Sequence, residues 1–271
     1  MTSRRIRPSA AVVMLAIVLA VTVVGPWFAP FSPTEQLDPI AMASMPPSFT
    51  HPFGTDTFSR DVLSRVLYGA RVSLGIATLA VAVALSLGTL VGATAALVGG
   101  RTDLLLMRLT DTALAFPRIL LLLLLVASTG SLSAPTFALL IGATGWMTTA
   151  RLVRQETRRL LATEHLRSAR VLGVPWPRLV RRHLLPGLLP TLAAAGTIAF
   201  AAAVPLEAGL SFLGLGVQPP DPSWGNIITG AESRVLERWW MVLFPTLCIV
   251  ATVLAANVVA ERITVERRRR P

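Results

Sequence analysis

Long runs of apolar residues alternate with short polar, arginine-containing segments along the chain. Because an apolar helix crosses the hydrocarbon core of a bilayer in about 20 residues, the length of these runs indicates membrane-spanning helices. We predict six spans, at residues 10–29, 72–98, 107–127, 134–150, 188–213 and 239–260. The third contains Pro117 and the fourth is short, so their ends are the least sharply defined. No run alternates apolar and polar positions as a transmembrane β-strand does, so the pattern favours an all-α, polytopic membrane protein of about six transmembrane helices.

Glycines recur along the predicted span at residues 72–98, at Gly75, Gly88 and Gly92. Small residues let helix backbones approach each other closely inside a membrane. We therefore expect this span to be buried among the others.

The segment at residues 32–71, between the first two spans, is rich in proline at its start. Proline fixes its own φ and restricts the residue before it, so we expect extended chain up to Pro52. The spacing of Phe58 and Val62 with the apolar residues that follow then predicts a short amphipathic helix over residues 57–67, lying at the membrane surface.

Three side chains near the ends of predicted spans are candidates for a role at the membrane. An intramembrane charge is costly, so Glu207 faces water or a polar passenger at the end of a transport path, bonds to backbone freed by Pro205, or reaches the outer interface. Asp111 is expected to pair with an arginine at the opposite interface. Trp224 is expected to anchor the chain at the outer interface, where tryptophan is enriched.

All 25 basic residues are arginines, and the formal net charge is +11. With the N-terminus in the cytosol, 20 of the 25 arginines fall on the cytosolic side. This asymmetry follows the positive-inside rule and predicts a multi-pass protein of the inner or plasma membrane with both termini cytosolic. The position of the arginines beside the predicted spans favours contact with membrane lipid over binding to nucleic acid.

The first predicted span follows a cluster of arginines, as both a secretory signal and an uncleaved anchor do. Prolines crowd the place where a cleavage site would lie, so we favour an uncleaved span. The expected organisation is a cytosolic tail and first helix (1–31), an extracytoplasmic segment (32–71), and a five-helix core with a basic tail (72–271). A cytosolic loop at residues 151–186 interrupts that core.

The residue content argues against catalysis by this chain. A phosphate-binding loop of the Walker type needs a lysine, and the sequence contains none. The three histidines, His51, His165 and His183, lie outside the spans and form no cluster at metal-binding spacing. Cys248 is the one cysteine and lies in an apolar run, which indicates a packing role. We expect a non-enzymatic protein that binds neither a cofactor nor a metal.

The polar loop at residues 163–183 has the pattern of two short helices that meet at Gly173. A glycine there can take a positive φ and end the first helix, and Pro175 is compatible with the start of the second. An ordered loop of this kind indicates docking to a soluble partner. Its five arginines at 167, 170, 178, 181 and 182 would equally suit a helix pair lying on anionic lipid.

The spacing from Gly173 through nine residues to His183 and Pro186 resembles the cytosolic loop of ATP-binding-cassette importer permeases. In that family the loop is usually written Glu-Ala-Ala-x-x-x-Gly, nine residues, then Ile-x-Leu-Pro. Further similar stretches lie at residues 53–56, 59–65, 68–74, 107–111, 114–117, 150–154, 207–220 and 222–225. Together they cover roughly residues 50 to 257 in the family's order, and more narrowly resemble the second (C-type) permease subunit of dipeptide, oligopeptide and nickel transporters.

The chain departs from the family pattern within this loop. Arg167, Ser168 and Ala169 stand where Glu-Ala-Ala is usual, so a basic residue replaces an acidic one. If the usual glutamate pairs with a basic group on the ATPase, either the partner has changed or Glu164, one turn earlier, substitutes. His183 stands where isoleucine is common.

The resemblance implies an ATP-driven importer that takes up peptides or related small solutes. Its expected partners are a second permease subunit, one or two cytosolic ATPases that bind ATP and Mg²⁺, and an extracytoplasmic substrate-binding protein. The residues implied in docking the ATPase are Glu164, Arg167, Ser168, Ala169, Gly173 and Pro186. Those implied in the pathway or its outer mouth are Asp56, Arg60, Asp61, Arg71, Glu207, Ser211, Gln218 and Trp224.

Other cargoes and functions remain open at this point. Nickel, oligosaccharide or opine cargo would use the same machinery, although the spans lack histidine and Cys248 alone makes no nickel site, which favours peptides. A non-transporting membrane scaffold would keep the spans without docking an ATPase. A nucleic-acid-binding anchor would show salt-dependent retention of DNA.

Overall fold

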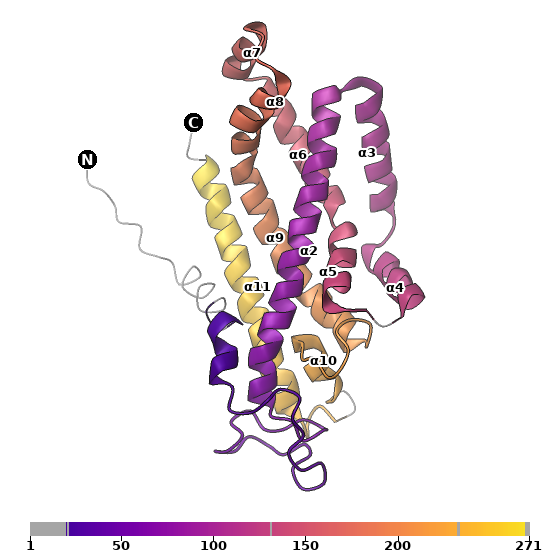
Figure 1. Ribbon diagram of the computed structural model, residues 1–271, viewed down its shortest axis with the longest axis vertical. Coiled ribbons are helices and arrows are strands. Elements are labelled where there is room, and N and C mark those ends of the chain that lie inside the picture. Colours follow the sequence, from indigo (N-terminus) through magenta and orange to yellow (C-terminus); the bar gives the residue numbers. More distant parts are fainter. Residues whose placement is uncertain (1–19, 21, 131, 232–233, 269–271) are drawn as a thin grey trace, which may run out of the picture. The chain divides into compact units, whose positions relative to one another are not determined.

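The computed structural model describes residues 20, 22–130, 132–231 and 234–268, where the regular structure is helical apart from one β-bridge between Thr55 and Asp61. The elements in chain order are η1 (Gly25–Phe28), α2 (Val62–Val98), α3 (Gly100–Ala115), α4 (Arg118–Thr129), α5 (Ala134–Ala143), α6 (Trp146–Leu161), α7 (Glu164–Val171), α8 (Trp176–Leu179), η2 (Val180–Leu184), α9 (Leu185–Phe212), α10 (Trp224–Thr229) and α11 (Trp239–Arg268) (Figure 1).

The chain divides into two compact units. Unit 1 contains the described parts of Met1–Thr78, Val126–Ala138 and Phe200–Val259, and therefore the segment before α2, the start of α2, α10 and most of α11. Unit 2 contains the described parts of Leu79–Leu125, Leu139–Ala199 and Ala260–Pro271, and therefore α3 and α6 to α8.

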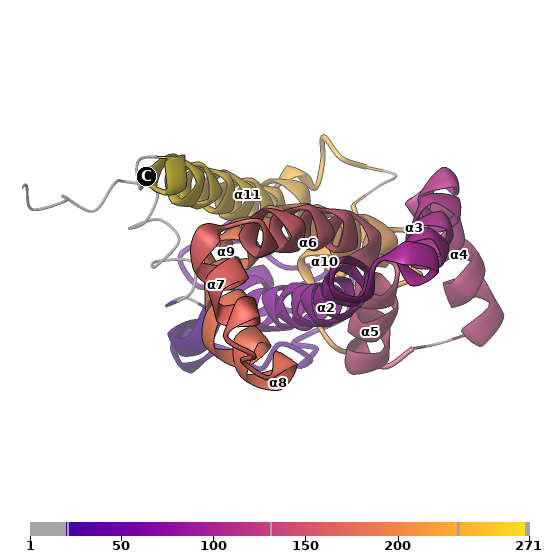
Figure 2. The ribbon, with the colours of Figure 1, turned by 90° about the horizontal axis from the view of Figure 1, so that it is seen from above.

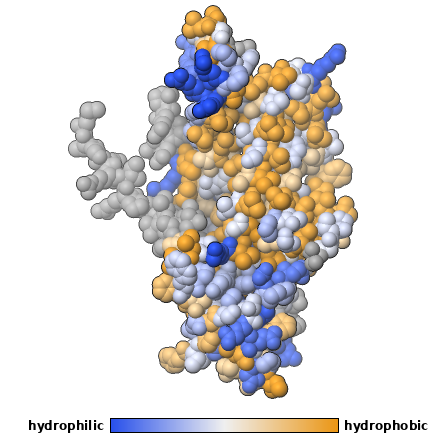
Figure 3. Space-filling model, viewed as in Figure 1, coloured by the Kyte–Doolittle hydropathy of each residue, from blue (hydrophilic) through white to orange (hydrophobic). Residues whose placement is uncertain are grey.

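Among the described residues, three helical stretches are long and apolar enough to cross a membrane: α2, the unbroken run of α8, η2 and α9, and α11. A fourth exists if the bent pair of α3 and α4 counts as one span. Hydrophobic residues cover much of the visible face over α3, where Leu104, Leu105 and Leu109 are exposed, as expected of a surface in contact with lipid (Figure 3). The predicted span at residues 10–29 lies largely outside the described residues.

Helix α2 begins later than the predicted amphipathic helix over residues 57–67. The prediction was wrong for the first part of that range, because the Asp56 carboxylate accepts hydrogen bonds from the backbone N–H groups of Phe58 and Arg60 and holds a turn there. Asp61 then accepts the N–H of Ser64 at 2.7 Å, as a helix cap does, and α2 runs on into the predicted span without a break.

Two of the predicted spans are broken helices. The span at residues 107–127 bends by 82° between α3 and α4, because Pro117 forces Phe116 into an extended conformation. The span at 134–150 ends as α5 and resumes as α6, with Thr144 and Gly145 between them. There the Arg118 guanidinium donates to the Ile141 carbonyl at 2.7 Å, and any side chain at 145 would meet it.

The glycines of α2 differ in their surroundings. A Cβ at Gly88 would lie 2.5 Å from the Thr149 side chain and one at Gly92 would lie 2.3 Å from the Ala150 carbonyl oxygen, so close packing of α2 against α6 depends on both. Gly75 is exposed and a Cβ there would meet nothing within 4 Å, so the prediction of a packing role was wrong at that position.

The contrast between Gly92 and Gly75 gives a matched test on one helix. We expect Gly92→Ala to lower the free energy of unfolding by about 1–3 kcal/mol, because the backbone of α6 must move away from the added methyl group. Gly75→Ala should be neutral or stabilising by up to about 1 kcal/mol, since alanine favours the helix. Thermal unfolding of both variants in detergent would measure this, and equal midpoints would contradict the packing argument.

Candidate functional site

The loop between α6 and α9 consists of two short helices that meet at Gly173, as predicted. Gly173 has φ +74°, and the N–H of Val174 donates to the Ala169 carbonyl at 3.1 Å while the N–H of Leu172 donates to the Ser168 carbonyl. A glycine with positive φ after the last turn is a common helix ending, which lets the chain reverse into Pro175 and α8.

Buried leucines and a histidine pair hold this loop on the rest of unit 2. Leu166 of α7 and Leu179 of α8 are at most 2% exposed, and Leu184 packs with Val153 of α6 in one apolar cluster. The Nε2 atom of His165 lies 3.0 Å from Nδ1 of His183. The loop is therefore a fixed structure at the N-terminal end of α9 (Figures 1 and 2).

Most of the predicted docking residues face outward from the loop. The side chains of Glu164, Arg167, Ser168 and Pro186 are exposed, and Ala169 is half-buried. The sequence interpretation missed the two most exposed apolar side chains of the loop, Val171 and Leu172, which are 87% and 82% exposed. Figure 3 shows a hydrophobic tip with strongly polar atoms beside it at this loop. The sequence could have indicated this apolar tip, because two large apolar residues stand directly before the glycine in an arginine-rich segment.

Arginines of α6 are tied to α3 by two aspartates. Asp103 is 7% exposed and accepts hydrogen bonds from both Arg154 and Arg158. Its hydrogen bond raises the pKa of the Arg154 guanidinium, so this arginine stays charged. Asp111 pairs with Arg151, which confirms the predicted pairing with an arginine, and both side chains of that pair are 53% exposed. The helix leading into the loop is thereby braced against α3.

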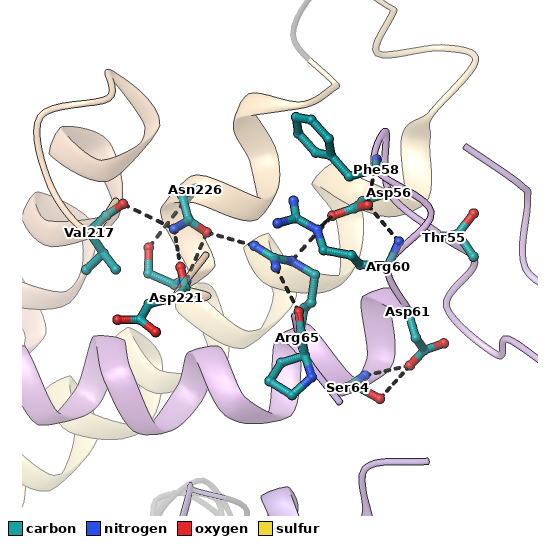
Figure 4. A network of polar contacts seen from close by, with 12 residues as sticks. Thr55, Asp56, Phe58, Arg60, Asp61, Ser64, Arg65, Val217, Asp221 and Asn226 are labelled. Atoms are coloured by element: carbon teal, nitrogen blue, oxygen red, sulfur yellow. Dashed lines mark hydrogen bonds and ion pairs between the residues drawn. The ribbon is translucent and has the colours of Figure 1, made fainter. Parts of the chain in front are cut away.

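The acidic and basic residues predicted for an outer mouth form a buried network in unit 1 (Figure 4). Asp56, Asp61 and Arg65 are at most 2% exposed, and Arg60 is 9% exposed. The Nε atom of Arg60 donates to Asp56 Oδ2 at 2.7 Å, and Asp61 binds His51 Nδ1 at 2.9 Å. Arg71 lies apart from this network and is exposed.

The predicted residues in the last turns of α9 and in the chain after it belong to the same unit. Glu207 is fully buried, and the Ser211 hydroxyl donates to its Oε1 atom at 2.7 Å. Gln218 is half-buried and donates to the carbonyls of residues 214 and 216. The prediction of Trp224 as an interfacial anchor was wrong: the side chain is 2% exposed and its indole N–H donates to the Val66 carbonyl at 3.1 Å.

Comparison with known proteins places most of the helical region in one family. A family model described as a binding-protein-dependent transport system inner membrane component matches residues 64–269. The chain is 32% identical over 253 residues to the dipeptide transport system permease protein DppC of Bacillus subtilis, covering 93% of this chain and 78% of that protein. It is 33% identical over 253 residues to the oligopeptide transport system permease protein OppC of Haemophilus influenzae, covering 93% and 81%.

The chain belongs to this family. It is a permease subunit of an ABC importer, which confirms the resemblance seen in the sequence. The family match runs from the first turn of α2 to the end of α11, so it includes both the loop at Gly173 and the buried residues of α9 and α10. Asp56 and Arg60 of the permease precede the matched region.

Proposed function

We propose that this permease pairs with a sister permease to form a path for peptides or related small solutes. An extracytoplasmic binding protein delivers the cargo in this proposal. Relatives that are named dipeptide and oligopeptide permeases support the choice of cargo. The absence of a cluster of three or more metal-ligating side chains among the described residues favours it over nickel.

We further propose a topology of six spans in the cell inner membrane, with both termini and the α7–α8 loop in the cytosol. The distribution of arginines supports this orientation, since 20 of the 25 fall on one side. The loop itself is rich in exposed arginines, which suits the leaflet where anionic lipids lie.

The observation that carries the proposal is a fixed loop with an unpaired apolar tip. Val171 and Leu172 lie at the end of α7, in a loop that buried leucines hold in place, so they suit a groove on a cytosolic ATPase. ATP and Mg²⁺ bind to that ATPase in this proposal, and the permease holds no cofactor. Closure of the ATPases would move α7 and switch the permease between inward and outward openings, with each state selected by differential binding.

The outer-mouth residues have two roles in this proposal. Arg71 and Gln218 offer polar groups at the surface of unit 1 for contact with the binding protein or cargo. The buried residues shape that surface from within: Asp56, Arg60, Asp61, Glu207, Ser211 and Trp224.

Leu172→Asp should prevent co-purification of the ATPase subunits with the tagged permease. The carboxylate would have to lose its hydration in an apolar groove, and we expect at least about a tenfold loss of association. Because Leu172 is 82% exposed, the unfolding temperature of the permease should not change. Leu172→Met keeps the volume and apolar character and serves as the control.

The same preparation tests the proposed function as a whole. Recovery of a second membrane subunit and one or two ATPases with the wild-type chain, and ATPase stimulation by their assembly, is the expected result. Recovery of the wild-type permease alone would contradict the importer proposal and favour a membrane scaffold.

A further inference from the structure

A cavity of about 280 Å³ in unit 1 takes no part in the docking described above. Its walls come from the turn before α2, from the first turn of α2, and from the chain between the end of α9 and the start of α11. Charged, uncharged polar and apolar side chains all line it.

The charged wall of the cavity carries more positive than negative charge. Asp56, Arg60 and Arg65 are the charged residues that line it, so one carboxylate faces two guanidinium groups. Asp61 pairs with His51 and does not line the cavity. Glu207 does not line it either, because Ser211 stands on the wall and bonds to Glu207 behind it. Asp56 is shared between the two arginines as their ion-pair partner, and a second carboxylate in the cavity would give Arg60 a partner of its own.

Both guanidinium groups retain hydrogen-bonding capacity. Arg65 is 1% exposed, and its Nη atoms donate to the Pro33 carbonyl and, at 3.5 Å, to Asn226. Its Nε atom lies 3.5 Å from Asp56 Oδ2 in an ion pair and makes no hydrogen bond among the described residues (Figure 4). Arg60 uses Nε on Asp56, and no described residue accepts a hydrogen bond from its Nη atoms. A carboxylate is the anion whose two oxygens match such donors.

Apolar side chains line part of the cavity wall, among uncharged polar ones such as Gln218 and Asn226. Phe58, Val217, Ile227 and Met241 line it beside the polar side chains, and the Arg60 guanidinium lies 4.8 Å from the centre of the Phe58 ring. A ligand that suits these walls has a carboxylate next to an apolar group. The C-terminal residue of a peptide with an apolar side chain has both.

We propose that this cavity binds the free C-terminal carboxylate of a peptide. Arg60 donates hydrogen bonds from its Nη atoms to the carboxylate, Arg65 adds charge from behind, and the apolar wall receives the last side chain. The inference rests on the proposed function for the identity of the cargo, and it adds a site at which the permease itself selects peptides by their C-terminus.

The test uses a dipeptide of alanine and p-benzoylphenylalanine, whose ketone crosslinks to nearby C–H bonds on illumination. The full permease, assembled with its partner subunits in nanodiscs, is illuminated with the free acid or with the C-terminal amide, and the crosslinked residues are mapped by mass spectrometry. We expect crosslinks at cavity residues such as Met241 with the free acid, and about tenfold less yield with the amide.

Arg60→Gln should reduce the crosslinking by the free acid to the level of the amide, and Arg60→Lys should restore part of it. Arg234→Gln is the control, because Arg234 is an exposed arginine of the same unit that does not line the cavity. Equal yields of acid and amide on the wild-type permease, or crosslinks only outside the cavity, would overturn the inference without any variant having to fold. In either case ATPase stimulation in the same nanodiscs still reports on the importer function, so the two failures are distinguishable.

Discussion

Replacing Gly173 with valine should abolish solute uptake by the reconstituted importer while leaving the permease inserted in the membrane. Gly173 has φ +74°, a region that costs a β-branched residue on the order of 1–3 kcal/mol. Nothing lies within 4 Å of a Cβ built at this position, so the cost is backbone strain and no clash is involved. The chain would relieve this strain by breaking the hydrogen bond between the Val174 N–H and the Ala169 carbonyl that closes the end of α7. The tip of the loop would then be displaced.

Uptake of labelled peptide into proteoliposomes measures the loss, and the amount of permease in purified membranes measures insertion. Gly173→Asn is the matched control, because asparagine tolerates a positive φ far better than valine and should retain much of the activity. Wild-type uptake by Gly173→Val would show that the loop ending at Gly173 has no part in coupling.

Asp103→Ala is expected to cause the second large effect, a loss of the bracing between α3 and α6. The substitution removes three hydrogen bonds from Arg154 and Arg158 and leaves two guanidinium groups facing each other. The two arginine side chains are 28% and 50% exposed, so water compensates part of the loss, and we expect about 1–3 kcal/mol of destabilisation.

The neighbouring pair provides the comparison for this effect. Asp111 and Arg151 are both 53% exposed, so Asp111→Ala should cost less than about 1 kcal/mol. Thermal unfolding in detergent at low and high salt would separate the two variants. If the two variants unfold at the same temperature, the burial of Asp103 does not increase the stability of the contact between α3 and α6.

Sequence patterns predicted those parts of the molecule that depend on local chemistry. The spans at 72–98 and 239–260 lie within α2 and α11, and the span at 188–213 matches α9 except for its last residue, because apolar run length determines such helices. The ending at Gly173 was also predictable, since few residues other than glycine reverse a helix in this way.

The remaining features depend on contacts that local patterns do not contain. The break between α5 and α6 follows from Arg118, which lies 23 residues before the Ile141 carbonyl that it binds. Trp224 carried the composition of an interfacial anchor, but a carbonyl 158 residues earlier accepts its indole N–H and draws it inside. The charged residues of the cavity likewise stand in the sequence, but only the fold shows that Asp56, Arg60 and Arg65 line it while Asp61 does not.

The π-helical turn η2 sets the rotational phase between the loop and the long helix that follows it. The Leu185 N–H bonds to the carbonyl of Val180, five residues back. In an α-helix, residues five apart differ in direction by roughly 140°, so Leu179 and Leu184 could not both point into the protein. The wider turn brings both inside, where each is 1% exposed. The wider turn thus sets the direction in which the apolar tip of the loop points relative to α9.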